Sequence, residues 1–263
     1  MGIRRHLGAI ELKKIGIVGG VSWYSTVEYY KTICQLSHEQ PRAQEVEGPP
    51  AVPEMVIESL NINKSFNLRS QPGDDASWRQ FDNYFQKALR RLVASGADLA
   101  IIASNTPHNR YDSITRGISI PVLNIFDEVA KECARHGVHN ALILGTAPTM
   151  SSPVFPSLLA KFGIHGAVPS ADQDRVQIIK LIDELQAGEN HGAAERLQRI
   201  AERSLSVNSD KRQAVCLSCT ELPLAFPDLG DAPTFEINGI LYLNTTYIHA
   251  KAAFEYAVST NHA

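Results

Sequence analysis

A candidate acid/base cysteine ends an apolar run late in the chain. The run AVCLSC ends at Cys219, and Thr220 and Glu221 follow it directly. If the run is a buried strand, Cys219 stands at its carboxyl-terminal tip, while Cys216 lies within the strand and points into the core. A thiol at a helix start has its thiolate stabilised by the helix dipole. We interpret Cys219 as reactive; the alternative is a buried, inert cysteine.

The CxxC spacing of Cys216 and Cys219 is also found in zinc sites and in redox-active cysteine pairs. A structural zinc site needs a second ligand pair, and neither Cys34 nor Cys133 belongs to one. No histidines stand at ligand spacing, and a cysteine inside the core does not suit a redox pair. We therefore predict no metal. The four cysteines, in a chain of this length without a secretory signal, indicate reduced thiols and a cytoplasmic protein.

Two other turns carry polar or small residues at the end of an apolar run. Ser104, Asn105 and Thr106 bring hydroxyl and amide groups together, and Pro107 suits the first turn of a helix. Either these groups bind a ligand, or Ser104 or Thr106 only caps that helix. Gly19-Gly20, in GIVGGVSW, does not match the GxGxxG of a dinucleotide site. It is either a plain tight turn or a place where backbone N–H groups hold a carboxylate.

Short, fully apolar runs indicate parallel strands that are covered on both faces. They occupy residues 13–20, 54–62, 97–104, 120–125, 140–146 and 214–219. Helical periodicity falls between and after them, at residues 22–33, 78–95, 127–136, 176–186, 193–205 and 250–258. This alternation predicts an α/β fold with parallel sheets flanked by helices. Two Pro- and Gly-containing stretches, Gln40–Pro53 and Asn67–Asp75, are predicted to be loops that can act as lids.

The strand ends repeat in a way that predicts two similar lobes. KKIGIVGG opens the first half and HNALILGT opens the second, while ASNT and SCTE end later strands in each half. Ligands of open α/β sheets bind at the carboxyl ends of the strands, so a cleft between the lobes brings all four turns together. We assign residues 14–121 plus 239–263 to the amino-terminal lobe and residues 122–238 to the carboxyl-terminal lobe.

Composition limits the classes of function. The 263 residues are 44% hydrophobic and 20% charged, as in a globular protein, and the net charge is −3. The basic residues are scattered, which argues against a nucleic-acid partner. No apolar run approaches the roughly 18 residues of a membrane span, so we predict no membrane association.

Four motifs in this order and spacing resemble the aspartate/glutamate racemase family. They are GGVSWYST (19–26), ASNTPH (103–108), LGTAPTM (144–150) and SCTELPL (218–224), and the resemblance runs from about residue 14 to 257. The WxST form of the first motif is most similar to the broad-specificity or L-specific branch. The resemblance implies a two-lobed fold, an interlobe active site, a homodimer and racemisation of an amino acid without PLP or metal. In such enzymes two opposed residues, usually both cysteines, remove and return the α-proton.

The resemblance also assigns residues. Cys219 matches the second catalytic cysteine, and Ser104 stands where the first is expected; a hydroxyl is a far poorer base than a thiolate. Similar enzymes with a hydroxyl residue there look asymmetric between the two enantiomers. The implied substrate-binding positions are Gly20, Ser22, Asn105, Thr106, Thr146, Thr149 and Thr220. Arg175 lies near a family basic residue that holds a side-chain carboxylate, and Lys64 is a looser alternative.

The sequence therefore predicts a racemase for aspartate, glutamate or related amino acids, with Cys219 and Ser104 as the opposed pair. An arylmalonate-type decarboxylase is one alternative, because such enzymes also keep a single protonating cysteine in the second lobe. A catalytically silent protein that binds a small ligand in the same cleft is another. Exchange of the α-proton in D₂O separates a racemase from a silent binder.

Overall fold

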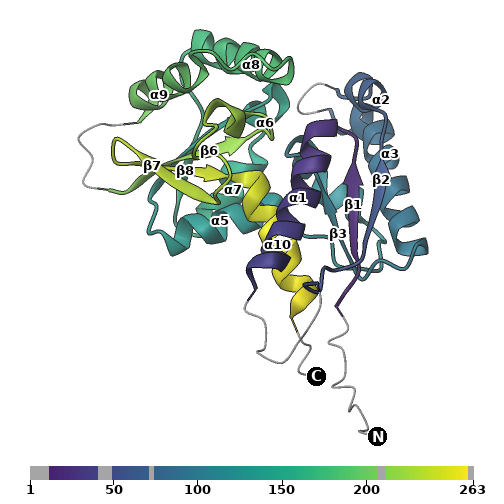
Figure 1. Ribbon diagram of the computed structural model, residues 1–263. Coiled ribbons are helices and arrows are strands. Elements are labelled where there is room, and N and C mark those ends of the chain that lie inside the picture. The colour runs from purple at the N-terminus through teal and green to yellow at the C-terminus, as the bar shows by residue number, and fades with distance from the viewer. Residues whose placement is uncertain (1–11, 41–48, 71–73, 206–210, 260–263) are drawn as a thin grey trace, which may run out of the picture.

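The computed structural model describes residues 12–40, 49–70, 74–205 and 211–259. Two α/β lobes lie side by side (Figure 1). The first is built on a parallel sheet of three strands in the order β2-β1-β3. These strands are β1 (Ile15–Gly19), β2 (Met55–Ser59) and β3 (Leu99–Ile102). Strands β1 and β3 are entirely buried, which explains why they are apolar without alternation.

The second lobe repeats this plan and extends it. Its sheet has the order β5-β4-β6-β8-β7, and only β7 runs antiparallel to its neighbour. The strands are β4 (Asn140–Gly145), β5 (His165–Ala167), β6 (Gln213–Ser218), β7 (Thr234–Ile237) and β8 (Ile240–Asn244). The trio β5-β4-β6 matches β2-β1-β3, so β3 and β6 hold equivalent places. The predicted two-lobed α/β fold is confirmed.

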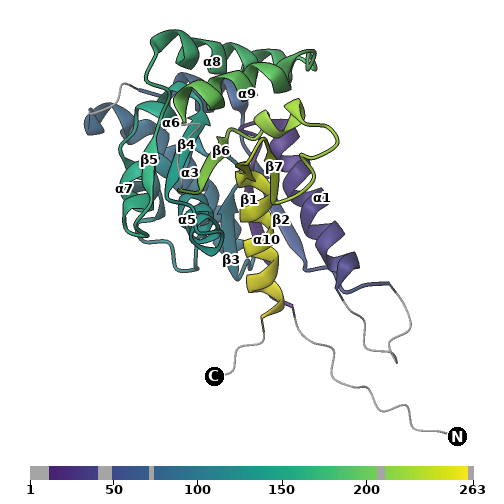
Figure 2. The same ribbon diagram turned by 90° about the vertical axis from the view of Figure 1, so that its left-hand side faces the viewer.

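Helices cover both faces of each sheet. In the first lobe, α3 (Asp75–Ala94) packs on one face, and α1 (Trp23–Glu39) and α10 (Thr245–Val258) pack on the other. In the second lobe, α8 (Asp172–Gln186) and α9 (Ala193–Ser204) form one layer, seen at the top of Figure 2. The opposite face carries α5 (Ile125–Arg135) and α7 (Val154–Ala160).

The chain crosses between the lobes twice. It first leaves the amino-terminal lobe near Leu123 and returns between β8 and α10. Strand β8 pairs with β6, so residues 240–244 belong to the second sheet rather than to the first lobe, where the sequence boundary at 239 placed them. Helix α10 does join the first lobe, because Ala250, Ala253 and Phe254 pack in the core that contains β1 and β3. The chain therefore returns to the first lobe after Asn244, one strand later than the predicted boundary at residue 239.

Some predicted segments take another form. Residues 120–125 make one isolated bridge, Ala100 to Val122, and α5 starts at Ile125, so the predicted strand is absent there. Residues 62–67 form a short helix, α2 (Ile62–Asn67), which joins the predicted strand at 54–62 to the predicted loop at 67–75 and overlaps each by one residue. Most of the first predicted lid, residues 41–48, and residues 71–73 of the second lie outside the described residues.

Candidate active site

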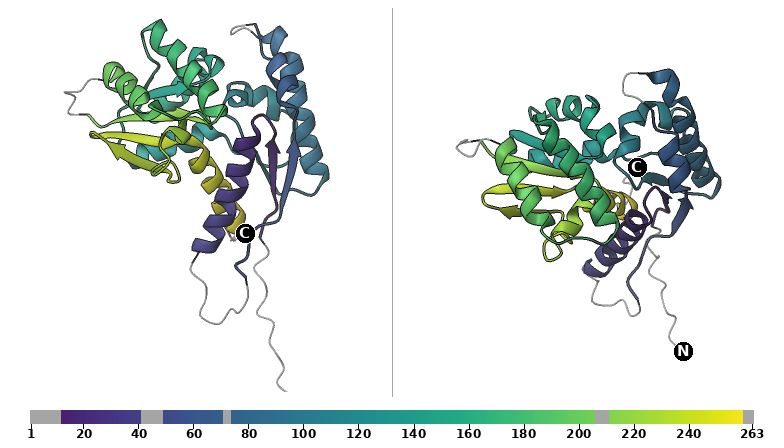
Figure 3. Two further views of the ribbon diagram at one scale, coloured as in Figure 1. Left: turned by 45° about the horizontal axis from the view of Figure 1, so that its top comes forward. Right: turned by 90° about the horizontal axis from the view of Figure 1, so that it is seen from above.

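A cavity of about 470 Å³ lies between the lobes, a volume typical of small-molecule sites. Seen from above, the two lobes stand next to each other (Figure 3), and residues of both line the cavity. The carboxyl ends of β3 and β6 both open into it, so Ser104 and Cys219 line the same space from opposite lobes. Its lining also includes Ser22, Ile62, Phe66, Arg69, Ser70, Asn105, Thr106, Thr146, Ile179, Ile182, Asp183, Gln186, Thr220 and Glu221.

The turn that carries Ser104 is held by hydrogen bonds on both sides. The Ser104 N–H donates to the Ile102 carbonyl over 2.8 Å, which turns the chain sharply after β3. The next residue, Asn105, is buried and its Nδ2 donates to Thr245 Oγ1 over 3.1 Å. Among the described residues, Asn105 Oδ1 has no hydrogen-bond partner although it is buried. A ligand donor in the cavity would satisfy it, because a buried acceptor left unpaired is costly.

Hydroxyl groups join the two lobes beside this turn. Thr106, at the start of η1 (Thr106–Arg110), and Thr146, before α6 (Ala147–Ser151), hydrogen-bond through their Oγ1 atoms over 2.9 Å. Thr146 Oγ1 is also 3.1 Å from Thr149 Oγ1. Thr149 is fully buried and supports Thr146 rather than lining the cavity. These hydroxyls can give hydrogen bonds to a substrate carboxylate.

Cys219 is paired with a buried carboxylate. Its Sγ donates to Glu221 Oε2 over 3.0 Å, and Thr220 Oγ1 donates to the same oxygen over 2.9 Å. The other carboxylate oxygen accepts from Gln186 Nε2 over 3.2 Å. Burial and the adjacent Glu221 charge raise the pKa of the Cys219 thiol well above its usual range. The resting group is therefore a thiol that already points its proton at an acceptor.

The expected helix-dipole stabilisation of the Cys219 thiolate is not what the structure provides. The segment after Cys219 is only a short 3₁₀ turn, η2 (Leu222–Ala225), and Glu221 precedes it. One backbone hydrogen bond, from Glu221, does favour the thiolate, but it is outweighed by burial and by the Glu221 charge. Cys216 is buried in the core as predicted, where a hydrogen bond with Cys133 and burial raise its pKa.

Arg69 is the cationic side chain of this cavity among the described residues. Its guanidinium lies 5.1 Å above the Phe66 ring, and its Nε is buried without a hydrogen-bond partner in the described part of the chain. Burial lowers the pKa of Arg69, while Cys219 and Glu221 oppose that shift. A half-buried cation with an unused donor is a binding group for an anion.

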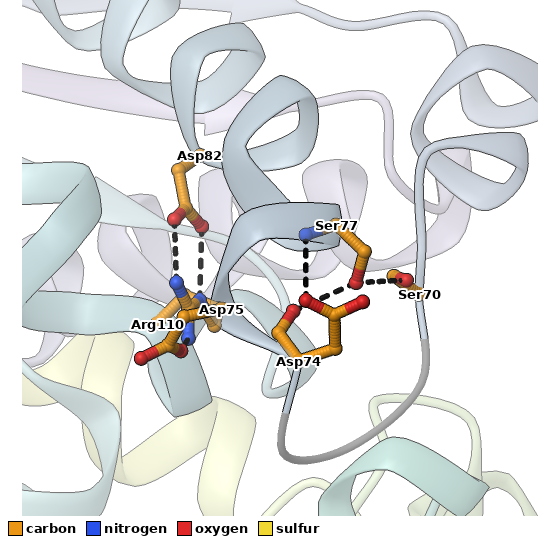
Figure 4. A network of polar contacts seen from close by, with 6 residues as sticks. All are labelled: Ser70, Asp74, Asp75, Ser77, Asp82 and Arg110. Carbon is orange, nitrogen blue, oxygen red and sulfur yellow. Dashed lines mark hydrogen bonds and ion pairs between the residues drawn. The ribbon is translucent and has the colours of Figure 1, made fainter.

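A polar network anchors the segment that follows Arg69 (Figure 4). Ser70 Oγ donates to Ser77 Oγ, and Ser77 Oγ donates to the Asp74 carbonyl, so Ser70 is tied to the capped start of α3. On the other side of this helix start, Arg110 of η1 binds Asp82 through two nitrogens and also Asp75. The network therefore fixes one wall of the cavity relative to the turn that carries Ser104.

Most of the residues predicted from sequence line this cavity, but Gly20, Thr149 and Arg175 do not. Arg175 lies farthest from its predicted role. Its guanidinium donates to the carbonyls of Pro169 and Ser170 and pairs with Asp172, in a neighbouring hollow. The local chain direction at the start of α8 turns it away. Lys64 lies over the Tyr84 ring at 4.8 Å, also outside the cavity lining.

In the turn after β1, Gly20 has a structural role, whereas Ser22 lines the cavity. The Gly20 N–H donates to Thr26 Oγ1 over 2.8 Å, so it is already used within the turn. Gly20 has φ +75°, and an added Cβ would lie 2.2 Å from the Leu60 carbonyl oxygen. The tight-turn interpretation accounts for this glycine. Ser22 lines the cavity at the start of α1, and its side chain makes no capping hydrogen bond.

Sequence reasoning missed several cavity residues. Glu221 follows Cys219 in the same motif, so its position beside a reactive thiol was a signal that could have been used. Three other lining residues carry no comparable signal. Arg69 lies in an irregular segment, and Asp183 and Gln186 lie on an exposed face of α8. In the described part of the chain, no three His, Cys, Asp or Glu side chains gather as metal ligands. No described helix has the length and apolarity to cross a membrane.

Comparison with known proteins places this arrangement in a family. A family model described as Asp/Glu/Hydantoin racemase matches residues 18–253. The crystal structure of an aspartate racemase homologue from Pyrococcus horikoshii superposes with a TM-score of 0.72 and 29% identity, covering 94% of this chain and 100% of that one.

Two curated relatives match over shorter stretches. A broad-specificity amino-acid racemase of Bacillus subtilis is 35% identical over 26% of this chain and 30% of its own length. Glutamate racemase of Listeria monocytogenes is 27% identical over 59% of this chain and 55% of its own length. The chain thus spans less than two thirds of these curated relatives. The family model covers nearly all of both lobes, and on that evidence the chain belongs to the Asp/Glu/Hydantoin racemase family.

Proposed function

We propose that this protein is an amino-acid racemase that works by 1,1-proton transfer without a cofactor. The observation that carries the proposal is the placement of Cys219 and Ser104 at equivalent strand ends of two similar lobes, on one cavity. Inversion at a carbon needs two acid/base groups on opposite faces, and two opposed strand tips can supply them.

The proposed first step begins with the thiol proton. Glu221 Oε2 accepts the proton of Cys219 Sγ as substrate binds, and the resulting thiolate removes the α-proton from one face of the substrate. The electron pair left on the α-carbon delocalises into the substrate carboxylate. Donors aimed at that carboxylate stabilise the developing charge. The Thr106 and Thr146 hydroxyls line the cavity and can donate to that carboxylate. Thr220 donates to Glu221, and Asn105 offers its unpaired Oδ1 to a donor of the ligand.

The second step returns a proton to the other face. Ser104 Oγ–H donates to the α-carbon, and the Ser104 alkoxide regains a proton from solvent. Glu221 releases to solvent the proton that it took from Cys219, which restores the resting enzyme. In the reverse direction Ser104 must act as the base, for which a hydroxyl is poorly suited. We therefore expect one enantiomer, the one whose α-proton faces Cys219, to be deprotonated much faster than the other.

Exchange of the α-proton in D₂O tests the proposal directly. Loss of the Hα signal is followed by NMR for a panel of D- and L-amino acids with purified protein. We expect exchange and inversion for some of them, at a rate unaffected by EDTA or by carbonyl reagents that trap PLP. Absence of exchange across the panel contradicts racemase activity and leaves the silent binder. Release of CO₂ from an arylmalonate without amino-acid exchange would favour the decarboxylase.

Replacing Ser104 with cysteine should restore the missing base. Ser104→Cys changes little volume at a half-exposed turn, so unfolding free energy should change by about 1 kcal/mol at most. A thiol is a much better base than a hydroxyl, so exchange from the slower enantiomer should rise by about tenfold or more. Exchange rates measured separately from the two enantiomers should become more nearly equal. An unchanged ratio would remove Ser104 from the second proton-transfer position.

A further inference from the structure

Two helices give the cavity apolar walls. On α2, Ile62 and Phe66 stand four residues apart on one helix face and are 44% and 62% exposed. Facing side chains come from α8, where Ile179 and Ile182 also line the cavity. Large apolar side chains left open to a cavity gain from being covered by an apolar group of a ligand. The walls therefore favour an apolar group between α2 and α8.

Among the residues that the structure describes, the charges that line the cavity leave no cation for a second carboxylate. The described lining residues that carry charge are Arg69, Asp183 and Glu221. Glu221 is already bonded to Cys219, Thr220 and Gln186. Arg69 and Asp183 then remain, one positive and one negative. In the sign of its charges, this pair matches the α-carboxylate and α-ammonium of a single amino acid.

We infer that the substrate has an uncharged, apolar side chain rather than a second carboxylate, an inference that rests on the proposed function. A dicarboxylic amino acid would bring its extra negative charge into a cavity already lined by two acids and one base. Arg175, the residue that could have balanced it, is bound to Asp172 and to two carbonyls outside this cavity. Burying an unpaired charge is much more costly than burying an apolar group.

Three amino acids of nearly the same shape test the inference. Leucine, asparagine and aspartate each branch at Cγ into two heavy atoms, but differ there in polarity and charge. We expect kcat/KM for α-proton exchange, measured by NMR in D₂O on both enantiomers, to be highest for leucine. Leucine should exceed aspartate by about tenfold or more, with asparagine between them. Equal values, or a preference for aspartate, would overturn the inference.

A charge added to the apolar wall should reverse this preference. Ile62→Lys places a second cation in the cavity, so kcat/KM should rise for aspartate and fall for leucine, moving their ratio by about tenfold or more. Val27→Lys adds the same charge on an exposed part of α1 outside the cavity lining and is the matched control. A shift of equal size in both variants would mean that net charge, not the wall, sets the ratio, and would contradict the inference.

Binding measurements separate this inference from the proposed reaction. Saturation-transfer NMR on the wild-type protein compares leucine and aspartate whether or not either exchanges. Leucine bound more tightly than aspartate, without exchange of any amino acid, would support the apolar site and remove the racemase activity. Tighter binding of aspartate would overturn the apolar site even if exchange were found, and binding of neither would overturn both.

Discussion

Cys219→Ser should lower kcat/KM for α-proton exchange by about a thousandfold or more. A serine hydroxyl cannot supply the thiolate that takes the α-proton, and removal of a positioned acid/base group typically costs 10²–10⁴-fold. With Ser104 opposite, the variant would have two hydroxyls and no competent base on either face. The loss should appear in both directions, because Cys219 is the base for one enantiomer and the acid for the other.

The measurement compares exchange rates with folding stability in the same preparations. Cys219 is buried and the change removes little volume, so unfolding free energy should stay within about 2 kcal/mol of the wild-type value. Cys34→Ser is the matched control, because Cys34 is a partly exposed thiol on α1 and does not line the cavity. Exchange at near wild-type rate in Cys219→Ser would exclude this residue from the mechanism.

Acidification from pH 7 to 4.5 should lower the free energy of unfolding by about 2 kcal/mol through His108 alone, a residue at the junction of the lobes. His108 and His249 are both fully buried there, with their rings 5.4 Å apart. Burial lowers the pKa of His108 from 6.5 to about 4. Burial and the nearby His108 lower the pKa of His249 well below its usual value.

The direction follows from which state binds more protons. Between pH 6.5 and 4 the unfolded chain protonates these histidines while the folded protein does not, so their contribution is complete above pH 6.5 and is lost as pH falls towards 4. Tyr29 and the Leu123 carbonyl hold the His249 ring at 2.8 and 3.1 Å, which leaves a folded imidazolium no room to be solvated.

Urea unfolding at pH 7.5, 6.0 and 4.5 checks this expectation. His108→Asn should be less stable than wild type at pH 7.5 but should lose less on acidification, because one buried titrating group is gone. His191→Asn alters an exposed histidine in a turn and serves as the control, with a wild-type slope expected. A His108→Asn slope equal to that of wild type would assign the acid sensitivity to other groups.

How far sequence could predict the fold depends on how strongly each strand is buried. Four strands, β1, β3, β4 and β6, come from continuous apolar runs. Because these strands are buried on both faces, their sequences are apolar at successive positions and can be recognised. The edge strand β5 is only the three residues His165–Ala167, too short for any periodicity. The hairpin β7–β8 did carry a signal that was not used: Asn238-Gly239, both with positive φ, is a favoured two-residue turn.

Some site residues could likewise be predicted from the local sequence, while others depend on contacts with distant segments. Cys219 and Ser104 could be predicted because each ends a buried strand, which fixes its place at the sheet edge. Arg69 could not, because it follows α2 in an irregular segment whose path is set by the Ser70 network at the start of α3. Arg175 was aligned with a family position, but its own Asp172, one helical turn earlier, draws the guanidinium elsewhere.

The two crossings between the lobes have a mechanical consequence. Near one crossing, the Leu123 carbonyl accepts a hydrogen bond from His249 Nε2 of α10, the helix that follows the other. Bodies joined by two adjacent connections can rotate about the line between them, but cannot slide or twist freely. The gap between Ser104 and Cys219 is then governed by one angle, and the Thr106–Thr146 hydrogen bond holds one lobe to the other. A substrate that needs a wider angle can therefore enter only if this hydrogen bond breaks.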